Sequence, residues 1–244
     1  MIDAHCTALM EEFGLSPVMA AEIECYVMLV DAAPATLEAF WQPVDAAFRA
    51  EGLPILRIEQ ERGAHQFEIV TQVTTPLRLA HTLSRIRALI EAAGAAQAIA
   101  THFAAKPFAG QPSSGMHLHL HLADAEGLNS YHKTEDWTSD SLRYSLGGLL
   151  ALLPEQMPIF FPTHADHQRL EDADHVPKIR GWGVNNRYCA LRIPADPDLY
   201  HKRIEHRMPC ANARPEAAIA AMLEGVLHGL RGRIEPPEQV YGKT

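Results

Sequence analysis

The sequence has few of the features that mark secreted, membrane-bound or thiolate-metal proteins. Its four cysteines lie far apart and form no Cys-x-x-Cys pair, which favours reduced thiols over a disulfide framework or a thiolate zinc site. No apolar run reaches the roughly 20 residues that a membrane helix needs. The first residues lack the basic flank and apolar centre of a signal peptide. We therefore expect a cytoplasmic protein without a membrane partner.

Long basic stretches are lacking too. The formal net charge is -9, and lysines and arginines occur only in short clusters. A general nucleic-acid binder needs a basic face that neutralises backbone phosphates, so we expect no nucleic-acid partner. With 244 residues, 47% of them hydrophobic, the chain can bury a core as one large domain or two small ones.

Hydrophobic periodicity and turn residues predict an alternation of helices and strands. Helices are expected over residues 4–13, 35–51, 76–93, 139–153 and 215–230, the fourth stopped by Pro154. Extended segments are expected over residues 18–30, 55–59, 66–72, 117–122, 184–193 and 203–208. This mixture predicts an α+β fold, with an antiparallel sheet that is polar on its concave face and covered by helices on the other.

The segment Met116–Leu122 alternates histidine with leucine. A strand there places His117, His119 and His121 on one face and the leucines on the other. Imidazole is the commonest nitrogen ligand for metals and titrates near neutrality, so such a row suits a metal or a phosphate. A surface strand whose histidines merely tolerate solvent fits this segment equally well.

Carboxylates add to the possible ligand set. Glu22 and Glu24 share one face of a strand, an arrangement that is costly unless a cation lies between them. Glu61 and Glu68 flank a turn, and Glu205 lies among arginines. Oxygen ligands with one or two imidazoles favour Mg²⁺ or Mn²⁺ over zinc. For any single pair, a solvated face with a salt bridge remains the alternative.

Arginines supply groups that bind phosphate and carboxylate oxygens. Arg187 and Arg192 belong to one segment, and Arg203 and Arg207 lie two residues to each side of Glu205. Guanidinium groups bind such oxygens through paired hydrogen bonds and neutralise charge on a transferring phosphoryl group. A buried ladder of ion pairs would explain the Arg203–Arg207 segment nearly as well.

Several segments occur together in one order along the chain. They are Ala21–Glu24; Glu61 with His65–Ile69; Lys106–Gly110 running into Ser114–His119; Asn186–Arg187 through Arg192–Pro194; and Arg203–Arg207 before the helix over 217–230. Together they resemble the glutamine synthetases and their relatives that join glutamate to amines. Residues 231–237 look most like the gamma-glutamyl-polyamine branch. The resemblance implies one catalytic domain over residues 1–244, with a curved antiparallel sheet forming a half-open funnel backed by helices.

The resemblance also implies roles for individual residues. One divalent ion, Mg²⁺ or Mn²⁺, would be held by Glu24, Glu61 and Glu68, and a second by Glu22, His117 and Glu205. Residues near the ATP phosphates would be His119, Arg187, Arg192 and Arg203; substrate would be bound by Ser113, His117, Arg169 and Arg207; and Arg187, Arg207 and His175 would act in catalysis. The implied reaction converts a carboxylate to an acyl phosphate, which an amine opens to an amide.

The chain also departs from the family pattern. The β-rich N-terminal domain and the C-terminal helical region of the family are expected to be absent. The flap glutamate, which assists deprotonation of ammonium in the family, falls near His175, where Asp172 and Asp174 could substitute. Pro112-Ser113 replaces the usual Asn-Gly pair before Ser-Gly-Met-His.

These departures favour a ligase that uses an amine other than ammonia, within a small homo-oligomer such as a dimer. A catalytically inactive relative that binds nucleotide or metal, or docks on a partner, is the alternative. A third hypothesis is phosphorylation of a carboxylate or guanidino group without formation of an amide.

Overall fold

A computed structural model describes residues 1–29, 34–132, 139–172, 175–196 and 201–242. The α-helices are α1 Ile2–Phe13, α2 Pro34–Ala50, α3 Pro76–Gln97, α4 Asp140–Phe160 and α5 Pro215–Gly232, with short 3-10 helices at Ser130–His132 and His164–Glu171. The strands are β1 Ser16–Val27, β2 Ile55–Gln60, β3 Gln66–Thr71, β4 Thr101–His102, β5 Met116–Ala123, β6 Ile179–Val184, β7 Cys189–Ile193 and β8 Ile204–His206. The predicted α+β fold is confirmed.

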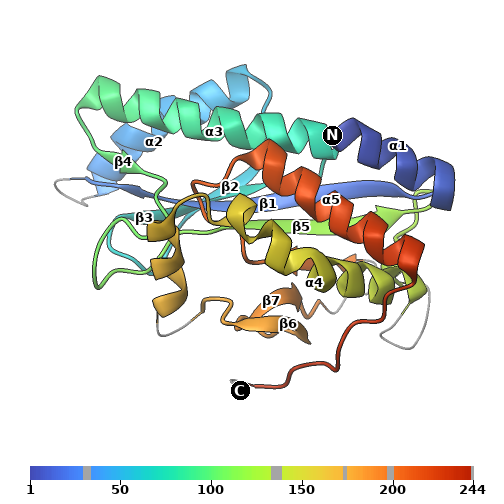
Figure 1. Cartoon of the computed structure of the whole chain (residues 1–244). Helices are drawn as coiled ribbons and strands as arrows, with labels where there is room; N and C mark the ends of the chain where they lie inside the picture. The colour runs from blue at the N-terminus through green and yellow to red at the C-terminus, as the bar shows by residue number, and fades with distance from the viewer. Residues whose placement is uncertain (30–33, 133–138, 173–174, 197–200, 243–244) are drawn as a thin grey trace.

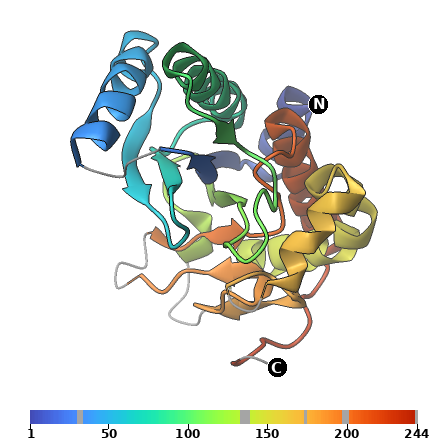
Figure 2. The ribbon, with the colours of Figure 1, turned by 90° about the vertical axis from the view of Figure 1, so that its left-hand side faces the viewer.

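The strands form one open, curved sheet in the order β2-β3-β1-β5-β8-β7-β6, with β4 paired to β1. All neighbouring strands are antiparallel except β6 and β7, so the sheet is mixed rather than purely antiparallel as predicted. Helices α1, α2, α3 and α5 lie along one side, and the sheet curls so that β6 and β7 lie below β1 and β5 (Figures 1 and 2).

Alternation along the central strands separates core from cleft. On β1, Ala21, Ile23 and Cys25 are fully buried against the helices, while the glutamates between them face the other way. On β5, the predicted leucine face is fully buried in the core. Each leucine or isoleucine buried in this way contributes about 1.5–3 kcal/mol. The strands that carry the polar face are therefore held by their apolar face.

Helix α4 does not stop at Pro154 as predicted. It continues to Phe160 through Pro154 and Pro158, both of which lie on its exposed side. A proline in a helix removes one backbone hydrogen bond, a loss that packing can outweigh. Here the packing is close, since a Cβ added at Gly148 would lie only 2.4 Å from the Cα of Gly229 in α5. Contact with α5 therefore carries the helix past both prolines.

The predicted strand over 184–193 is wrong in its first half: it includes only the last residue of β6, then a tight turn, and then β7. Strand β6 ends at Val184, and Asn185 follows in the left-handed region with φ 52°. The Asn186 side-chain oxygen then accepts a hydrogen bond of 3.0 Å from the backbone N–H of Tyr188. Asparagine tolerates the left-handed region and closes such turns with its side chain, so the Asn-Asn pair breaks the extended pattern.

The segment near the C-terminus packs along β6. Val240 N–H donates to the Trp182 carbonyl at 2.9 Å, and the Trp182 indole donates to the Pro237 carbonyl at 2.7 Å. The side-chain amide of Asn186 donates to the Gly242 carbonyl at 2.9 Å. This segment therefore covers the β6 edge of the sheet and supports the turn that carries Arg187. None of the described helices is long and apolar enough to span a membrane.

Candidate active site

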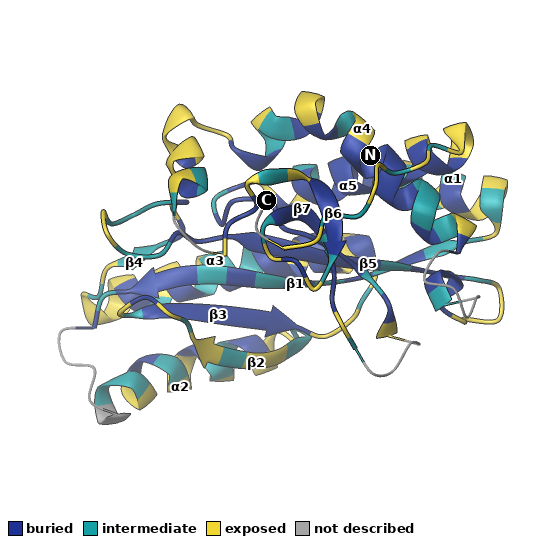
Figure 3. Ribbon diagram, turned by 90° about the horizontal axis from the view of Figure 1, so that it is seen from below, coloured by how far each residue is buried: buried dark blue, intermediate teal, exposed yellow. Residues whose placement is uncertain are grey.

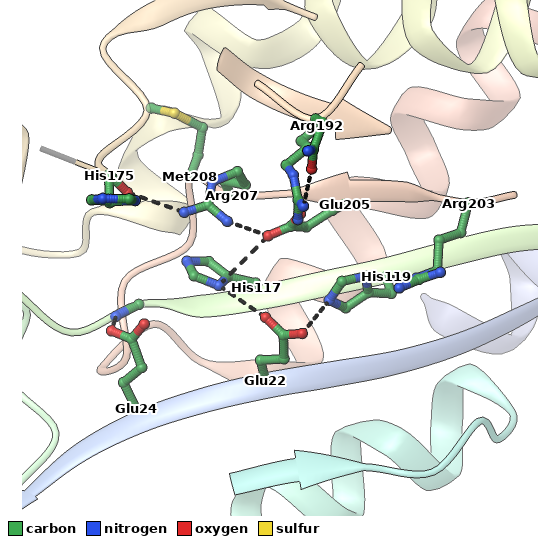
Figure 4. A network of polar contacts seen from close by, with 12 residues as sticks. Glu22, Glu24, His117, His119, His175, Arg192, Arg203, Glu205, Arg207 and Met208 are labelled. Atoms are coloured by element: carbon green, nitrogen blue, oxygen red, sulfur yellow. Dashed lines mark hydrogen bonds and ion pairs between the residues drawn. The ribbon is translucent and has the colours of Figure 1, made fainter. Parts of the chain in front are cut away.

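The polar face of the sheet forms the floor of a cleft of about 830 Å³. Most of the predicted site residues line it: Glu22, Glu24, Glu61, Glu68, Ser113, His117, Arg169, His175, Arg187, Arg192, Glu205 and Arg207. His119 and Arg203 do not line the cleft. They lie together beyond Glu22, where Arg203 Nε donates to His119 Nδ1 at 3.3 Å (Figure 4).

Strand register brings the acidic residues and histidines together. Glu22 on β1 lies directly opposite His117 on β5, and His119 lies opposite Glu205 on β8. On the other side of β1, Glu24 lies opposite Glu68 on β3. Directly opposed residues have Cβ atoms about 4.5–5.5 Å apart, so their side chains meet above the sheet.

Two overlapping groups of side chains can each hold a metal ion. In one, ligand atoms of Glu22, His117 and Glu205 all lie within 4.8 Å of one another; in the other, so do those of Glu24, Glu68 and His117. The predicted ligand Glu61 lines the same cleft but belongs to neither group. Carboxylate oxygens with one shared imidazole suit Mg²⁺ or Mn²⁺.

In the Glu24–Glu68 half of the floor, the positive charges of Arg57 and Arg169 do not offset the burial of the carboxylates. Burial raises the pKa of Glu68 to about 9, with further contributions from the negative charges of Glu22, Glu24 and Glu61. Burial also raises the pKa of Glu24 to about 7, although Arg169 and a 2.7 Å hydrogen bond from the Gly115 N–H oppose this. Crowded buried carboxylates of this kind fit a divalent cation. The cation would offset both the burial of their negative charges and the repulsion between them.

In the half of the floor around Glu205, arginines already balance the negative charge of the carboxylate. Arg192 Nη1 lies 2.6 Å from Glu205 Oε2, and Arg207 donates to Oε1 of the same carboxylate. Burial would raise the pKa of Glu205, but Arg207, His119, His117 and Arg192 outweigh it and hold the pKa at about 2. Burial and the charge of Arg207 lower the pKa of His117 to about 4, so this imidazole is neutral and can act as a metal ligand.

Glu22 links the two halves through histidines. Its carboxylate lies 3.3 Å from His117 Nδ1 and 3.2 Å from His119 Nε2, as the dashed lines of Figure 4 mark. Burial raises the pKa of Glu22, but its contacts with these two histidines overcome that effect and lower the pKa below its usual range. The Glu22 carboxylate is thus ionised and directed into the cleft.

Residues 30–244 match the family described as "Glutamine synthetase, catalytic domain". The chain belongs to this family. It is 36% identical over 140 residues to gamma-glutamylputrescine synthetase PuuA of Escherichia coli (strain K12), covering 57% of this chain and 29% of that protein. It is 32% identical over 190 residues to glutamine synthetase of Pyrococcus abyssi, covering 75% of this chain and 42% of that protein.

A solved structure described as a GmaS/ADP complex shares the fold of this glutamine synthetase domain. Its TM-score is 0.84 at 20% sequence identity, with 98% of this chain and 60% of that chain covered. The chain therefore spans less than two thirds of the length of these curated relatives and of this structure.

Arg169 lies in the cleft wall of this glutamine synthetase domain and is only 2% exposed. Its guanidinium donates to the carbonyls of Met208 at 2.8 Å and Arg207 at 3.0 Å, and one nitrogen lies 3.4 Å from His117 Nε2. These contacts hold the segment after β8 against the histidine strand. Its role at a substrate carboxylate stays a prediction.

The segment around His175, where the sequence predicts the counterpart of the family flap, forms one wall of the cleft. His175 is exposed, has φ 63°, and its carbonyl accepts a hydrogen bond of 3.0 Å from Arg207. Asp172 pairs with Lys106 and accepts a 2.8 Å hydrogen bond from the Ser113 N–H. Burial opposes these contacts, but they lower the pKa of Asp172. Asp172 therefore fixes the wall, and Asp174 lies outside the described residues.

Sequence reasoning missed Gln66 and the partner of Lys106. The buried Gln66 amide donates to the Ser113 carbonyl at 3.0 Å and lies 3.3 Å from Ser114 Oγ, which joins β3 to the segment before β5. Period-two spacing from Glu68 could have placed Gln66 on the cleft face. The Lys106–Asp172 pair joins residues 66 positions apart, and no local pattern indicates such a contact.

Proposed function

We propose that this chain is the catalytic domain, over residues 1–244, of a carboxylate–amine ligase that depends on ATP and a divalent metal. The product is a γ-glutamyl-type amide formed through an acyl phosphate, and the amine is other than ammonia. The main support is the convergence of buried carboxylates, one neutral histidine and buried arginines on one cleft. The name of the relative gamma-glutamylputrescine synthetase supports the substrate class.

The two ligand groups would hold Mg²⁺ or Mn²⁺ at the floor of the cleft. When bound, such ions neutralise the phosphoryl oxygens and shield charge as the phosphoryl group moves. The chain's own part is to present ionised oxygens at fixed positions. Glu22 and Glu205 do this in the metal-free protein, since their pKa values lie below the usual range.

The arginines supply the positive side of the phosphoryl-transfer site. Arg207 is 3% exposed and fixed by Glu205 and the His175 carbonyl, so its direction is set before substrate arrives. Arg187 is exposed at the cleft and can reach a phosphate that enters from solvent. Preorganised donors of this kind stabilise developing charge without reorganisation, which is the largest catalytic contribution in many enzymes.

The amine end of the cleft supports an amine other than ammonia. The flap glutamate is replaced near His175, whose side chain is exposed, and Asp172 is committed to Lys106 and Ser113. A larger amine that carries its own hydrogen-bonding groups needs less help from such a flap than ammonium does. We propose small-molecule carboxylate and amine partners, a cytoplasmic location and a homo-oligomer.

Calorimetric titration with a non-hydrolysable ATP analogue tests this proposal. Wild-type protein should bind the analogue in the presence of Mg²⁺ or Mn²⁺ and at least tenfold more weakly in EDTA. In Glu68→Gln, most of this difference between metal and EDTA should disappear. Glu51→Ala, an exposed carboxylate paired with Arg85 outside the cleft, is the matched control. Metal-dependent binding would justify a screen of acids and amines for ADP release.

Three outcomes of the titration and screen distinguish the hypotheses. ADP release that needs both acid and amine supports the ligase. ADP release without an amine points to phosphorylation alone. Absence of ADP release with every acid and amine would overturn the ligase in favour of the inactive relative, whether or not the analogue binds.

A further inference from the structure

The two ends of the sheet differ in how their outer strands are covered. The β6 end is covered by the segment over residues 237–242, through the hydrogen bonds of Val240 and Trp182 described above. At the other end, β2 pairs with β3, and no further strand lies beside it in the described part of the chain. In Figure 3, β2 is largely exposed, whereas the adjacent β3 is buried.

The backbone of β2 has hydrogen-bonding groups that point away from the sheet. Glu61 N–H donates to the Gln66 carbonyl at 2.8 Å, which marks this as a hydrogen-bonded pair of the β2–β3 ladder. Such pairs alternate along an antiparallel ladder, so the backbones of Arg57 and Glu59 point toward β3. The N–H and C=O groups of Ile58 and Gln60 therefore point outward.

We propose that two copies of this chain associate by antiparallel pairing of their β2 strands about a twofold axis at Ile58. Outward backbone groups at Ile58 allow a hydrogen-bonded pair on the axis. An unpaired strand edge is a template for pairing with another chain. A twofold axis perpendicular to the sheet keeps both clefts on the same side of a continuous sheet.

The charges of Arg57 and Glu59 favour a second copy of this chain as the partner of this strand edge. With Ile58 on the axis, Arg57 of each chain lies opposite Glu59 of the second copy, and this pairing occurs twice. These positions form non-hydrogen-bonded pairs, in which opposed side chains approach most closely. Arg57 and Glu59 line the cleft where it meets this edge, are about half exposed, and already lie 2.5 Å apart within the chain. Association would form a two-by-two arrangement of alternating charges across the paired strands.

Apolar surface lies beside the same edge. Leu56 is 57% exposed, and a groove of about 580 Å³ between α2 and β2 is lined by Trp41, Phe48 and Leu53. Under the twofold axis, the two grooves lie on the same side of the joined sheet, next to each other. Association would thus cover apolar area as well as satisfy backbone groups.

Sedimentation velocity of the full chain from about 2 to 200 µM tests this pairing. The wild type should shift from the 27.0 kDa monomer to a dimer as concentration rises. Arg57→Glu and Glu59→Arg should each weaken the dimer at least tenfold, because like charges then face each other twice. The double variant Arg57→Glu/Glu59→Arg should restore it, since the pairs are re-formed with their signs exchanged.

Ile58→Pro provides an independent test of backbone pairing. It removes an outward N–H while leaving the bonds of β2 to β3, and proline is tolerated at such edge positions. Circular dichroism checks that each variant is folded. A folded wild type that stays monomeric at 200 µM, or a dimer that is unchanged by Ile58→Pro and both charge reversals, would overturn the proposal. The readout does not depend on ATP, so it is separate from the ligase test.

Discussion

Glu205 and Glu68 are both buried carboxylates on the floor of one cleft, yet their pKa values move in opposite directions. Glu205 is held at about 2 by the positive charges around it, and Glu68 is raised to about 9 by burial and by neighbouring carboxylates. The Glu205 half therefore completes its charge balance with protein groups. The Glu68 half does not, and it must take up protons or a cation.

This difference separates a preformed part of the site from a part that a ligand completes. Paired charges around Glu205 fix Arg207 and Arg192 before any substrate binds. Around Glu68 and Glu24, carboxylates held together without a cation make the metal-free fold less stable. Proteins that bind metals through crowded carboxylates gain stability when the metal arrives.

The largest expected effect comes from Glu205→Gln. The variant keeps the side-chain shape but leaves the buried Arg207 and the partly buried Arg192 beside a neutral group. Removing one partner of a buried ion pair costs about 3–5 kcal/mol, so the free energy of unfolding should fall by about that amount. Urea unfolding at pH 7 in EDTA measures it.

Glu68→Gln is the matched variant from the other half. In EDTA at pH 7 it should be as stable as the wild type or more stable, because it removes a carboxylate whose negative charge is disfavoured there. Equal losses of stability for Glu205→Gln and Glu68→Gln would contradict the contrast between the halves.

The sequence predicted which residues of the site share a strand face, but not which strands lie side by side. Period-two spacing placed Glu22 and Glu24 on one face of a strand and His117 on one face of another, and the structure sets Glu22 directly opposite His117. Glu68 and Glu205, which lie on other strands, were candidate ligands from their residue type, but only the family resemblance grouped them with these residues. Local patterns carry no register between distant strands, so they could not indicate that Glu24 lies opposite Glu68.

The fold was predicted well where one periodicity held along a segment and less well where packing or turns intervened. The α+β class and most elements are confirmed. The helix that passes Pro154 depends on contact with α5, and the break after Val184 depends on one asparagine in the left-handed region. The extension of α4 and the break after Val184 each depend on a single residue or a distant partner. A periodic pattern over a whole segment carries no information about either.

The second prediction concerns pH in the metal-free protein. The pKa of Glu68 rises from 4.5 to about 9 on folding, so its stabilising contribution is full below pH 4.5 and is lost as pH rises toward 9. This amounts to about 3 kcal/mol between pH 5 and pH 7.5. Glu205 has the opposite sign, since its contribution is lost as pH falls from 4.5 to about 2.

Stability in EDTA should therefore be greatest near pH 5. Urea unfolding across pH 3–9 measures the profile, and Glu68→Gln should flatten its alkaline side. A wild-type profile that rises steadily from pH 5 to pH 9 would disprove this assignment.

The third prediction concerns proton release on metal binding. At pH 7, Glu68 is protonated and Glu24 is about half protonated, because their pKa values are about 9 and 7. A metal ion binds the ionised forms, so Mn²⁺ should release about one to two protons. Calorimetry in two buffers of different ionisation enthalpy measures the number. Glu68→Gln should release about one proton fewer, while Glu51→Ala should match the wild type.

The smallest expected effect on stability comes from an arginine outside both buried halves. Arg187 is exposed at the cleft, so Arg187→Gln should change the free energy of unfolding by no more than about 0.5 kcal/mol. Under the proposed function it should still weaken binding of an ATP analogue about tenfold, or about 1.4 kcal/mol. Arg62→Gln is the matched control, because Arg62 is also exposed and lines the cleft from the β2–β3 turn. Equal binding losses in the two variants would indicate general attraction of the nucleotide to positive charge. Loss confined to Arg187→Gln would assign the phosphates to the β6–β7 turn, beside the half of the floor that the protein compensates by itself.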